Sequence, residues 1–403
     1  MNEIRILLVP PNDLLRHPLP NRMYHIAKRL ARYYRIYLLA YPGHPLAGNV
    51  RRSLEAVEVA FKRFIRTSNL GIYYVVNYFQ MYAEIRRTLR SEGIDAIVHA
   101  NILPSLIASH LARKLGIPNI YDFLDYFPES ASAYYARGKG FVELGVKELI
   151  YAALRNSDIV VTPSLGLKEV VKSMVPEKPV RVIPNGVDAE LFKPIEQRIA
   201  RKSIGLDEGG HFLLLLGSLD VWLDVENVLR ALSKLRKSID VRLLVVGFSH
   251  AKLYYRLLLE YAKLYGVDRY IHTYPPQPYE RVPLFINSSD IVFAPYKRMI
   301  KNVATPLKIA EALACGVPVI TTNIAEFKIW YKQGIYTYST YEELENVMKY
   351  LLSNLDKIKA ELRKYSNSFR EVFSWENLAE KYRSVILETV VQTPRHNYNQ
   401  IIS

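Results

Sequence analysis

Short apolar runs alternate with segments of helical periodicity through the first half of the chain. The runs that predict buried strands are residues 4–9, 35–41, 95–100, 118–123, 158–162 and 180–183. Helical spacing of apolar residues predicts helices at residues 22–33, 104–115 and 141–156. Because parallel strands need a crossover between them, this alternation predicts a doubly wound α/β domain, with helices on both faces of a parallel sheet.

The alternation breaks at residues 184–186 (Pro-Asn-Gly) and then resumes. The polar stretch from there to Gly210 has no strong periodicity, which is typical of an interdomain connection. Further strands are predicted at residues 212–216, 241–246, 270–274, 290–295 and 317–320, and further helices at 225–236 and 375–391. We therefore expect two doubly wound domains, residues 1–190 and 191–374, whose strand ends face each other across a ligand cleft.

The stretch TPLKIAEALACGVPVI, residues 305–320, combines a predicted helix start with candidate chemistry. Thr305 suits the cap, Pro306 the first helical position, and Gly316 the helix end. Lys308 and the first-turn N–H groups would attract a phosphate, and Glu311 one turn later would accept hydrogen bonds from a ribose. The pattern favours a sugar-nucleotide site, and an ordinary amphipathic helix followed by a strand is the alternative.

Length and composition are those of a globular protein with two cores. The 403 residues are 50% hydrophobic, enough for two domains of roughly 200 residues each. The single cysteine, Cys315, lies on the apolar face of a predicted helix, so we expect no disulfide and no metal site. No apolar run approaches the roughly 18–20 residues of a membrane span, and the N-terminus has no signal-peptide pattern, so we expect a cytoplasmic protein.

The net charge of +15 is concentrated near the N-terminus, where residues 1–90 hold 15 Lys and Arg against 5 Asp and Glu. Basic and aromatic residues interleave through residues 51–90, including Phe61, Phe64 and Tyr73. This pattern predicts a surface that lies on anionic lipid, with the aromatic rings at the headgroups. A solvated face whose side chains cover a core is the alternative, and no nucleic acid is expected because no nucleic-acid-binding module is present.

Several motifs resemble the retaining glycosyltransferases of family four, which have the GT-B fold of two facing Rossmann-like domains. They are VIPNGVDAELFKP at 182–194, PLKIAEALACGVPVI at 306–320, DIVVTPS at 158–164, DAIVHAN at 95–101 and FSWENLAEKY at 373–382. The resemblance implies transfer of a sugar from a nucleotide diphospho-sugar with retained configuration and without a required metal. It further implies that the N-terminal domain binds the acceptor and is completed by the terminal helix, within 375–403, and that the C-terminal domain binds the donor.

The resemblance also assigns roles within the C-terminal domain. Glu311 matches the glutamate that binds the donor ribose, and Gly217 matches the glycine at the tip of the first strand, where the diphosphate comes close. Pro306 and Lys308 match a subgroup that reads P-x-K-x-x-E, in which Lys308 would face a donor phosphate and act in catalysis.

Some positions depart from the family pattern. A glutamate that usually contacts the transferred sugar is replaced by Val303, beside Asn302, which we take as a substrate-binding candidate. The usual Arg and Lys after the first strand of the second domain are replaced by Ser218 and Asp224. Since the leaving diphosphate still needs positive charge, other cations must supply it. The candidates are Lys308, Lys297, Arg298, Lys301 and Arg22.

Three further residues are candidates by position. Asp125, beside Leu124 where the family often has a histidine, would orient the acceptor hydroxyl or accept its proton, with loop capping as the alternative. His99 is predicted to line the cleft at a strand end. Tyr274 is predicted to lie near the donor base, with core packing as the alternative.

The sequence thus favours a hexosyltransferase at the cytoplasmic face of a membrane. Its expected donor is GDP-mannose, with a UDP-sugar next, and its expected acceptor is lipid-linked or a glycan. An epimerase or hydrolase acting on sugar nucleotides, and a non-catalytic protein that binds lipid or polyanions, remain as alternatives.

Overall fold

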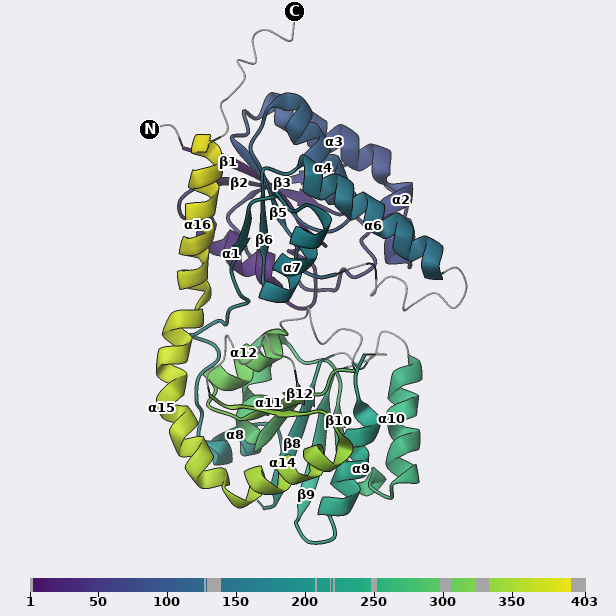
Figure 1. Cartoon of the computed structure of the whole chain (residues 1–403), viewed down its shortest axis with the longest axis vertical. Helices are drawn as coiled ribbons and strands as arrows, with labels where there is room; N and C mark the ends of the chain where they lie inside the picture. The colour runs from purple at the N-terminus through teal and green to yellow at the C-terminus, as the bar shows by residue number, and fades with distance from the viewer. Residues whose placement is uncertain are drawn as a thin grey trace, which may run out of the picture. The chain divides into compact units, whose positions relative to one another are not determined.

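Two parallel β-sheets organise the chain, one in each half (Figure 1). The computed structural model describes residues 3–126, 128, 139–206, 209–217, 219, 222–247, 252–297, 306–323 and 333–392. The chain divides into an N-terminal unit, Met1–Pro184 with Trp375–Ser403, and a C-terminal unit, Asn185–Ser374. Both units have helices on the two faces of a parallel sheet, which confirms the predicted class of two Rossmann-like domains.

The N-terminal sheet has seven strands in the order β3-β2-β1-β4-β5-β6-β7. The strands are β1 (Arg5–Val9), β2 (Arg35–Ala40), β3 (Val57–Ala60), β4 (Ala96–His99), β5 (Asn119–Asp122), β6 (Ile159–Thr162) and β7 (Val180–Val182). All neighbouring pairs are parallel. Because the inner strands are covered on both faces, every residue of β4, β5 and β6 is buried, and this explains their apolar runs in the sequence.

Helices cover both faces of this sheet. One face packs its alternating side chains, such as Leu7 and Leu39, against helices α2, α3 and α4. The opposite side carries α1 and α16, which lie side by side (Figure 1). The helices of the unit are α1 (Arg22–Leu30), α2 (Leu70–Val76), α3 (Tyr78–Ser91), α4 (Leu103–Leu115), α6 (Lys139–Asn156), α7 (Leu165–Met174) and α16 (Trp375–Gln392).

The last helix returns to the N-terminal unit, as the resemblance implied. The rings of His25 on α1 and Trp375 on α16 are stacked, with centroids 5.0 Å apart, and Arg29 forms a 2.6 Å ion pair with Glu376. Trp375 is fully buried. This helix therefore completes the N-terminal core with residues nearly 350 positions along the chain from α1.

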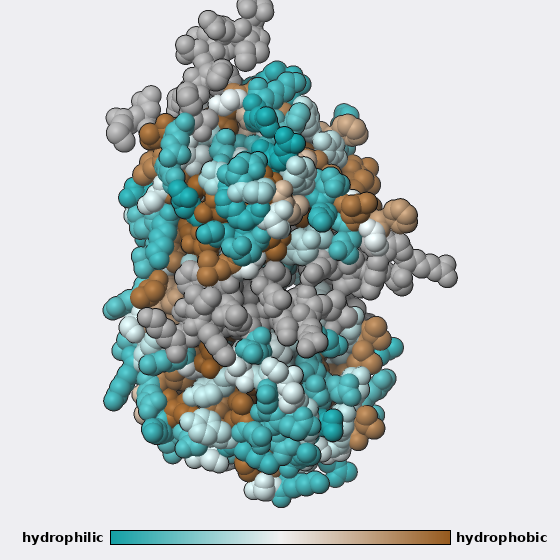
Figure 2. Space-filling view, viewed as in Figure 1, coloured by the Kyte–Doolittle hydropathy of each residue, from teal (hydrophilic) through white to brown (hydrophobic). Residues whose placement is uncertain are grey.

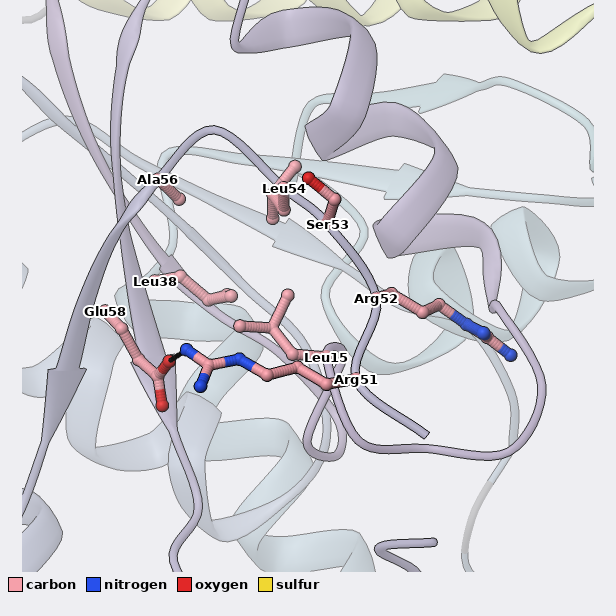
Figure 3. Close-up of a pocket in the computed structure, with 8 residues that line it drawn as sticks. All are labelled: Leu15, Leu38, Arg51, Arg52, Ser53, Leu54, Ala56 and Glu58. Carbon is pink, nitrogen blue, oxygen red and sulfur yellow. Dashed lines mark hydrogen bonds and ion pairs between the residues drawn. The ribbon is translucent and has the colours of Figure 1, made fainter. Parts of the chain in front are cut away.

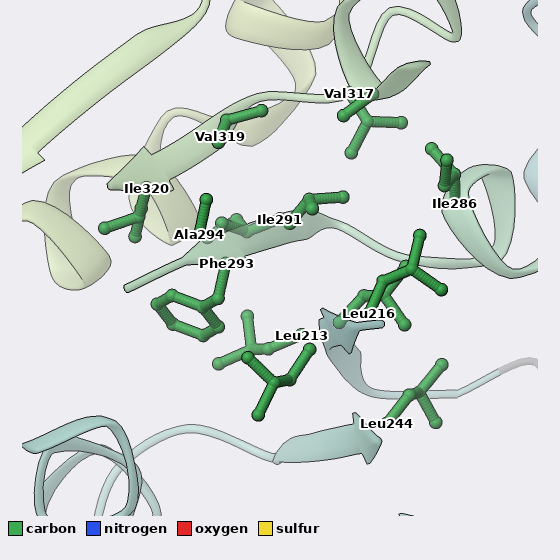
Figure 4. Close-up of a cluster of buried hydrophobic side chains, with 14 of the residues drawn as sticks. Leu213, Leu216, Leu244, Ile286, Ile291, Phe293, Ala294, Val317, Val319 and Ile320 are labelled. Carbon is green, nitrogen blue, oxygen red and sulfur yellow. The ribbon is translucent and has the colours of Figure 1, made fainter. Parts of the chain in front are cut away.

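The C-terminal sheet has six parallel strands in the order β10-β9-β8-β11-β12-β13. They are β8 (His211–Leu216), β9 (Val241–Val246), β10 (Ile271–Tyr274), β11 (Ile291–Ala294), β12 (Val319–Thr322) and β13 (Ile335–Tyr338). Figure 4 shows Leu213 of β8 beside Phe293 of β11, in the same buried cluster as Ile286 from a flanking helix. This dry core makes the strand ends a rigid platform.

Two groups of helices flank the C-terminal sheet. The first comprises α8 (Gln197–Ser203), α11 (Val282–Ser288), α12 (Leu307–Ala314) and α15 (Leu355–Phe373), in which α8 packs on α11 and α12 on α15. The second comprises α9 (Val225–Leu235), α10 (Lys252–Leu264) and α14 (Tyr341–Ser353), in which α9 packs on both neighbours. The described residues of this unit also contain two short 3-10 turns, η1 (Asp268–Tyr270) and η2 (Tyr279–Arg281).

The boundaries near residues 305–320 differ slightly from the prediction. Helix α12 begins at Leu307, with Pro306 as its N-cap, and Thr305 lies outside the described residues. Gly316 ends the helix with φ +72°, as predicted. The following strand begins at Val319 rather than Val317, because the N–H of Val317 still bonds to the Ala312 carbonyl and Pro318 has no N–H to donate.

Two other predictions need correction. The stretch to Gly210, which the sequence predicted as an interdomain connection without strong periodicity, contains the helix α8. The basic-aromatic region 51–90 contains β3, α2 and α3, and its Phe61, Tyr73 and Tyr74 are buried in the core, so these rings cannot reach a membrane. Among the described residues, no helix combines the length and the apolar character that crossing a membrane requires.

Candidate functional site

Two glycines at the tips of β8 and β9 bring backbone and a lysine close together. Gly217 and Gly247 have φ +98° and +122°, which favour glycine. A Cβ on Gly247 would lie only 2.6 Å from the Gly217 carbonyl oxygen, and a Cβ on Gly217 would lie 3.4 Å from Nζ of Lys308. The absence of both side chains therefore leaves space directly beside the Lys308 amine.

The N-terminus of α12 lies at the same end of the sheet. Pro306 caps it with extended backbone, φ −66° and ψ 133°, and no described side chain forms a capping hydrogen bond there. Within the described part of the chain, the first N–H of the helix that has a backbone acceptor is that of Ile309, which donates to the Pro306 carbonyl at 3.2 Å. The N–H groups of Leu307 and Lys308 are thus the donors available to an anion.

Lys308 carries its charge in a poorly solvated place. Its Nζ lies 5.7 Å from the centroid of the Tyr296 ring, which is buried and held by a β-bridge to Leu223. Burial lowers the pKa of Lys308 to about 8, against the opposing attraction of Glu311. The amine stays mostly protonated at pH 7, and an incoming phosphate would interact with it strongly because little water competes.

Glu311 lies one turn further along α12 and is 6% exposed. Its Oε1 accepts a hydrogen bond from the Tyr279 hydroxyl at 3.1 Å. Burial raises the pKa of Glu311 to about 7, while Tyr279 and Lys308 pull that pKa down. A carboxylate in this position can accept hydrogen bonds from hydroxyl groups of a ligand.

Two other candidates of the C-terminal unit lie near the same end of the sheet. Tyr274 ends β10, and its carbonyl accepts a 3.2 Å bond from the N–H of Gly247. Its ring packs edge-on against Phe285 with centroids 4.9 Å apart, so packing accounts for part of its surface. Lys297 has an exposed side chain and donates its backbone N–H to the Trp222 carbonyl at 2.7 Å. Ser218 and Asn302 lie outside the described residues.

The candidates of the N-terminal unit are engaged within that unit. Arg22 is 4% exposed, pairs through Nε with Asp122 at 3.2 Å, and donates through Nη1 to the Pro184 carbonyl at 2.8 Å. Its guanidinium therefore fastens α1 to β5 and to the end of the unit. A role for it beside a donor diphosphate remains a prediction.

His99 and Asp125 are also placed by local bonds. His99 is fully buried, its Nε2 lies 3.1 Å from Oδ1 of Asn119, and burial lowers its pKa to about 4. It is therefore a neutral packed ring at pH 7. Oδ1 of Asp125 accepts from the N–H of Tyr126 at 2.8 Å, and burial raises the pKa of that carboxyl. This bond is a loop cap, and a role of Asp125 at the acceptor stays a prediction.

A cavity of about 240 Å³ opens in the N-terminal unit between β2, β3 and the segment before β3 (Figure 3). Leu15 and Leu38 form apolar wall, and Arg51 reaches Glu58 at 3.3 Å. Glu58 also pairs with Arg16 at 2.7 Å, so the carboxylate at the rim already has two cationic partners. The cavity is smaller than the roughly 300–1,000 Å³ of ordinary ligand pockets, and we assign it no ligand.

Comparison with known proteins agrees with this geometry. Residues 20–191 match the model of Glycosyltransferase Family 4, and residues 196–368 match the model of Glycosyl transferases group 1. The chain belongs to the family 4 glycosyltransferases. The predicted family is thereby confirmed, whereas the subgroup with the P-x-K-x-x-E motif stays a prediction.

This family 4 member also shows similarity to individual proteins. It is 28% identical over 210 residues to the D-inositol 3-phosphate glycosyltransferase of Rhodococcus erythropolis, which covers 49% of this chain and 46% of that protein. The match thus spans about half the length of the curated relative. The activity, substrates and partners of this chain are therefore proposals.

Solved structures agree in fold along nearly the whole chain. Sucrose-phosphate synthase of Thermosynechococcus elongatus superposes with a TM-score of 0.81 at 14% identity, covering 97% of this chain and all of that one. HepE of Anabaena in complex with UDP-glucose gives 0.69 at 14% identity, covering 96% of this chain and all of that one. At such identities the likeness shows the fold alone, which confirms the predicted GT-B fold.

Three residues at the site were not found from the sequence. Gly247 carried a signal, since it directly follows an apolar strand as Gly217 does. Tyr279 and Tyr296 carried none, because nothing local distinguishes them from the other tyrosines of this 30-tyrosine chain. Only the packing of η2 and of the segment after β11 brings them to α12.

Proposed function

We propose that this chain transfers a hexose from a nucleotide diphospho-sugar to an acceptor, with retention of configuration. Family membership supports the reaction class. The observation that carries the proposal is the convergence of Gly217, Lys308 and Glu311 at one end of the C-terminal sheet. A diphosphate needs close backbone approach and a cation, and a ribose needs a hydrogen-bond acceptor, and these three residues supply all of them.

In this proposal the donor lies with its diphosphate at the first turn of α12 and its ribose at Glu311. The bond between the anomeric carbon and the diphosphate oxygen breaks, and the acceptor oxygen bonds to the same face of that carbon. The acceptor proton passes to the departing phosphate oxygen or to Asp125. Lys308 stabilises the negative charge that the leaving diphosphate gains, which is where such a cation lowers the barrier.

We also propose which sugar and nucleotide the donor carries and what kind of acceptor receives the sugar. We favour mannose from GDP-mannose, because that donor is common in the family, and place a UDP-sugar next, in line with the UDP-glucose in the HepE structure. The acceptor is a lipid-linked or glycan hydroxyl, taken up by the N-terminal domain. No described residue of the site discriminates guanine from uracil.

Replacement of Lys308 by methionine tests the proposal. We expect the affinity for UDP or GDP to fall about 10- to 100-fold, the loss of about 1.5–3 kcal/mol for a hydrogen bond to a charged group. Binding of the nucleoside without phosphates should change less than binding of the nucleotide, because Lys308 faces the phosphates and affects the ribose only through the charge of Glu311. Isothermal titration of the full chain measures both, after a thermal-shift screen identifies the nucleotide.

The exposed Lys263 on α10 provides the matched control. Lys263→Met removes the same charge and should leave nucleotide binding unchanged. Equal binding by wild type and Lys308→Met would contradict the proposed donor site. Conversion of the donor irrespective of any acceptor would instead indicate an epimerase or hydrolase.

We further propose that the enzyme works at the cytoplasmic face of an anionic membrane, through a patch on α2 and α3. Ile72, Val75 and Phe79 recur at helical spacing, with exposures of 52%, 63% and 80%. Ile65, 53% exposed, is held beside them because the Asn77 side chain bonds to both its N–H and its carbonyl. In Figure 2, apolar side chains reach the surface at the place of α2 in Figure 1.

Exposed cations accompany these apolar side chains. They are Lys62, Arg63, Arg66 and Arg86. Apolar groups flanked by positive charge fit the interface of an anionic lipid layer, where each cation contributes about 1 kcal/mol. We therefore propose that this patch contacts the membrane, in place of the buried aromatic residues of the same region that the sequence suggested.

Replacement of Phe79 by serine should weaken binding to phosphatidylserine-containing vesicles about 10- to 30-fold, the value of burying one phenylalanine. Raising the salt concentration should weaken binding of both proteins, because the lipid charge is screened within about 8 Å at physiological salt. Val391→Ser, at an equally exposed position of α16, is the control and should bind as wild type.

Weak, salt-insensitive vesicle binding by the wild type would end the membrane proposal. Vesicle binding without any nucleotide binding would favour a non-catalytic lipid-binding protein.

A further inference from the structure

A tyrosine outside α12 holds the carboxylate at the donor site. Tyr279, in the turn η2, is 8% exposed and donates its hydroxyl to Oε1 of Glu311 at 3.1 Å. Its ring packs against the fully buried ring of Phe192, with centroids 5.2 Å apart. The position of the Glu311 side chain therefore depends on two aromatic rings from other segments.

Phe192 belongs to the segment that follows the change of unit at Pro184. Its N–H donates to the Asp188 carbonyl at 2.8 Å, which closes a turn, and Arg370 of α15 donates to the Ala189 carbonyl at 3.1 Å. This turn is thus fixed to the body of the C-terminal unit. The ring of Tyr279 therefore packs against a fixed neighbour, Phe192, and its hydroxyl donates to one oxygen of the Glu311 carboxylate.

We propose that Tyr279 is a positioning residue for the donor ribose, which it serves by orienting Glu311 through this hydrogen bond. The inference rests on the proposed function, since it concerns the same nucleotide site. A carboxylate offers about four lone-pair sites on two oxygens. The hydrogen bond to Tyr279 fixes the position of Oε1. Oε2 is then the oxygen that accepts hydrogen bonds from the 2′- and 3′-hydroxyl groups of the ribose.

The same hydrogen bond also affects the protonation of Glu311. Burial raises the pKa of this carboxyl to about 7, and the Tyr279 hydroxyl and the Lys308 ammonium both favour the ionised form. Among the residues that the structure describes, the Cys315 thiol also lies close to Glu311, and burial raises its pKa far above neutrality, so it stays uncharged. Loss of the Tyr279 hydroxyl should therefore raise the Glu311 pKa further and leave more of the carboxyl protonated at pH 7.

The test compares wild type and Tyr279→Phe by isothermal titration with UDP or GDP from pH 6 to pH 9. At pH 7 we expect the variant to bind about 5- to 10-fold more weakly, the effect of one hydrogen bond. Affinity of both proteins should fall as pH decreases through the Glu311 pKa, and this fall should begin at a higher pH in the variant. Affinity of both proteins should also fall above about pH 8, where the Lys308 amine loses its proton, and this alkaline limb should be the same in the two proteins. The 2′,3′-dideoxynucleotide should bind both proteins equally, because it has no hydroxyl for Glu311.

Tyr265→Phe is a closely matched control. Tyr265 also donates to a glutamate, Oε1 of Glu226 at 3.0 Å, but on the surface of α9 and α10. Its loss should leave nucleotide binding and its pH profile unchanged. A second variant, Phe192→Leu, weakens the support of the Tyr279 ring and should lower ribonucleotide affinity by a smaller factor than Tyr279→Phe.

The outcomes separate this inference from the function on which it rests. Equal loss of ribonucleotide and dideoxynucleotide affinity would show a merely structural tyrosine and overturn the positioning role, as would an unchanged affinity and pH profile. Absence of nucleotide binding by the wild type would overturn the proposed function itself, and the inference with it. Loss confined to the ribonucleotide, with the shifted pH profile, supports both.

Discussion

Replacing Asp290 by alanine is expected to destabilise the C-terminal unit by about 3–5 kcal/mol, the cost of leaving buried charges without their partner. Asp290 is 2% exposed and directly precedes β11. It binds Arg201 of α8 at 3.1 Å and Lys359 of α15 at 2.6 Å. It also accepts the N–H of Phe212 in β8 at 2.9 Å. One carboxylate thus joins two helices and two strands, and its removal leaves two cations inside the protein.

Hydrogen exchange of the β8 and β11 amides measures this loss within the unit concerned. The matched control is Asp240→Ala, because Asp240 likewise pairs with two arginines, Arg236 at 2.6 Å and Arg242 at 3.5 Å, but is 53% exposed. The control should cost no more than about 1 kcal/mol. Similar losses for Asp240→Ala and Asp290→Ala would contradict the assignment of Asp290 as the central ion.

The effect of Asp290 should depend on pH in a defined direction. Burial by itself would raise the pKa of this carboxyl, but hydrogen bonds from His211, Lys359 and Gln197 and the Lys359 charge hold it well below its usual range. A group whose pKa is lowered by folding stabilises the protein fully above the pKa of the unfolded chain, which is about 4 for Asp. The difference between wild type and Asp290→Ala should therefore be constant from pH 5 to pH 8 and shrink as the pH falls below about 4.

Replacing Gly247 by alanine is expected to abolish tight donor binding and to destabilise the C-terminal unit by about 3 kcal/mol. The new Cβ would lie 2.6 Å from the Gly217 carbonyl oxygen, and backbone rather than a flexible side chain would have to move. Overpacking of this kind costs about 1–3 kcal/mol, and φ +122° adds strain of similar size. Because Gly217 borders the Lys308 amine, its displacement would narrow the space proposed for the diphosphate.

The Gly266→Ala variant distinguishes the cost of backbone strain from the cost of a steric clash of the new Cβ. Gly266 also has a positive φ, +66°, but a Cβ there would meet nothing within 4 Å. This variant should lose about 1–2 kcal/mol of stability and keep its nucleotide affinity. Thermal unfolding and isothermal titration measure the two quantities. Nucleotide binding by Gly247→Ala at the wild-type level would show that the strand tips tolerate displacement and that the diphosphate lies elsewhere.

Local periodicity was a sufficient guide to most of the fold. The strands β9 and β11 lie where uninterrupted apolar runs predicted them, because a strand buried on both faces needs apolar residues at successive positions. Local periodicity did not predict an element that is stabilised chiefly by residues far away in the sequence. Helix α8 has few apolar residues and is held by Arg201, which reaches Asp290 some 90 residues further on. A local sequence pattern does not predict such a helix.

The sequence by itself determined the two alternations of strand and helix, the family, and the local chemistry of α12, since Lys308 and Glu311 are neighbours by helical geometry alone. The tertiary structure decided which side chains meet from different segments. It brought Tyr279 and Phe192 to Glu311, placed Tyr296 beneath Lys308, and paired Arg22 with Asp122. It also buried Phe61 and Tyr73 while leaving Phe79 exposed. The physical reason is that periodicity reports which face of an element is apolar, whereas the partner of that face depends on contacts between residues far apart in the chain.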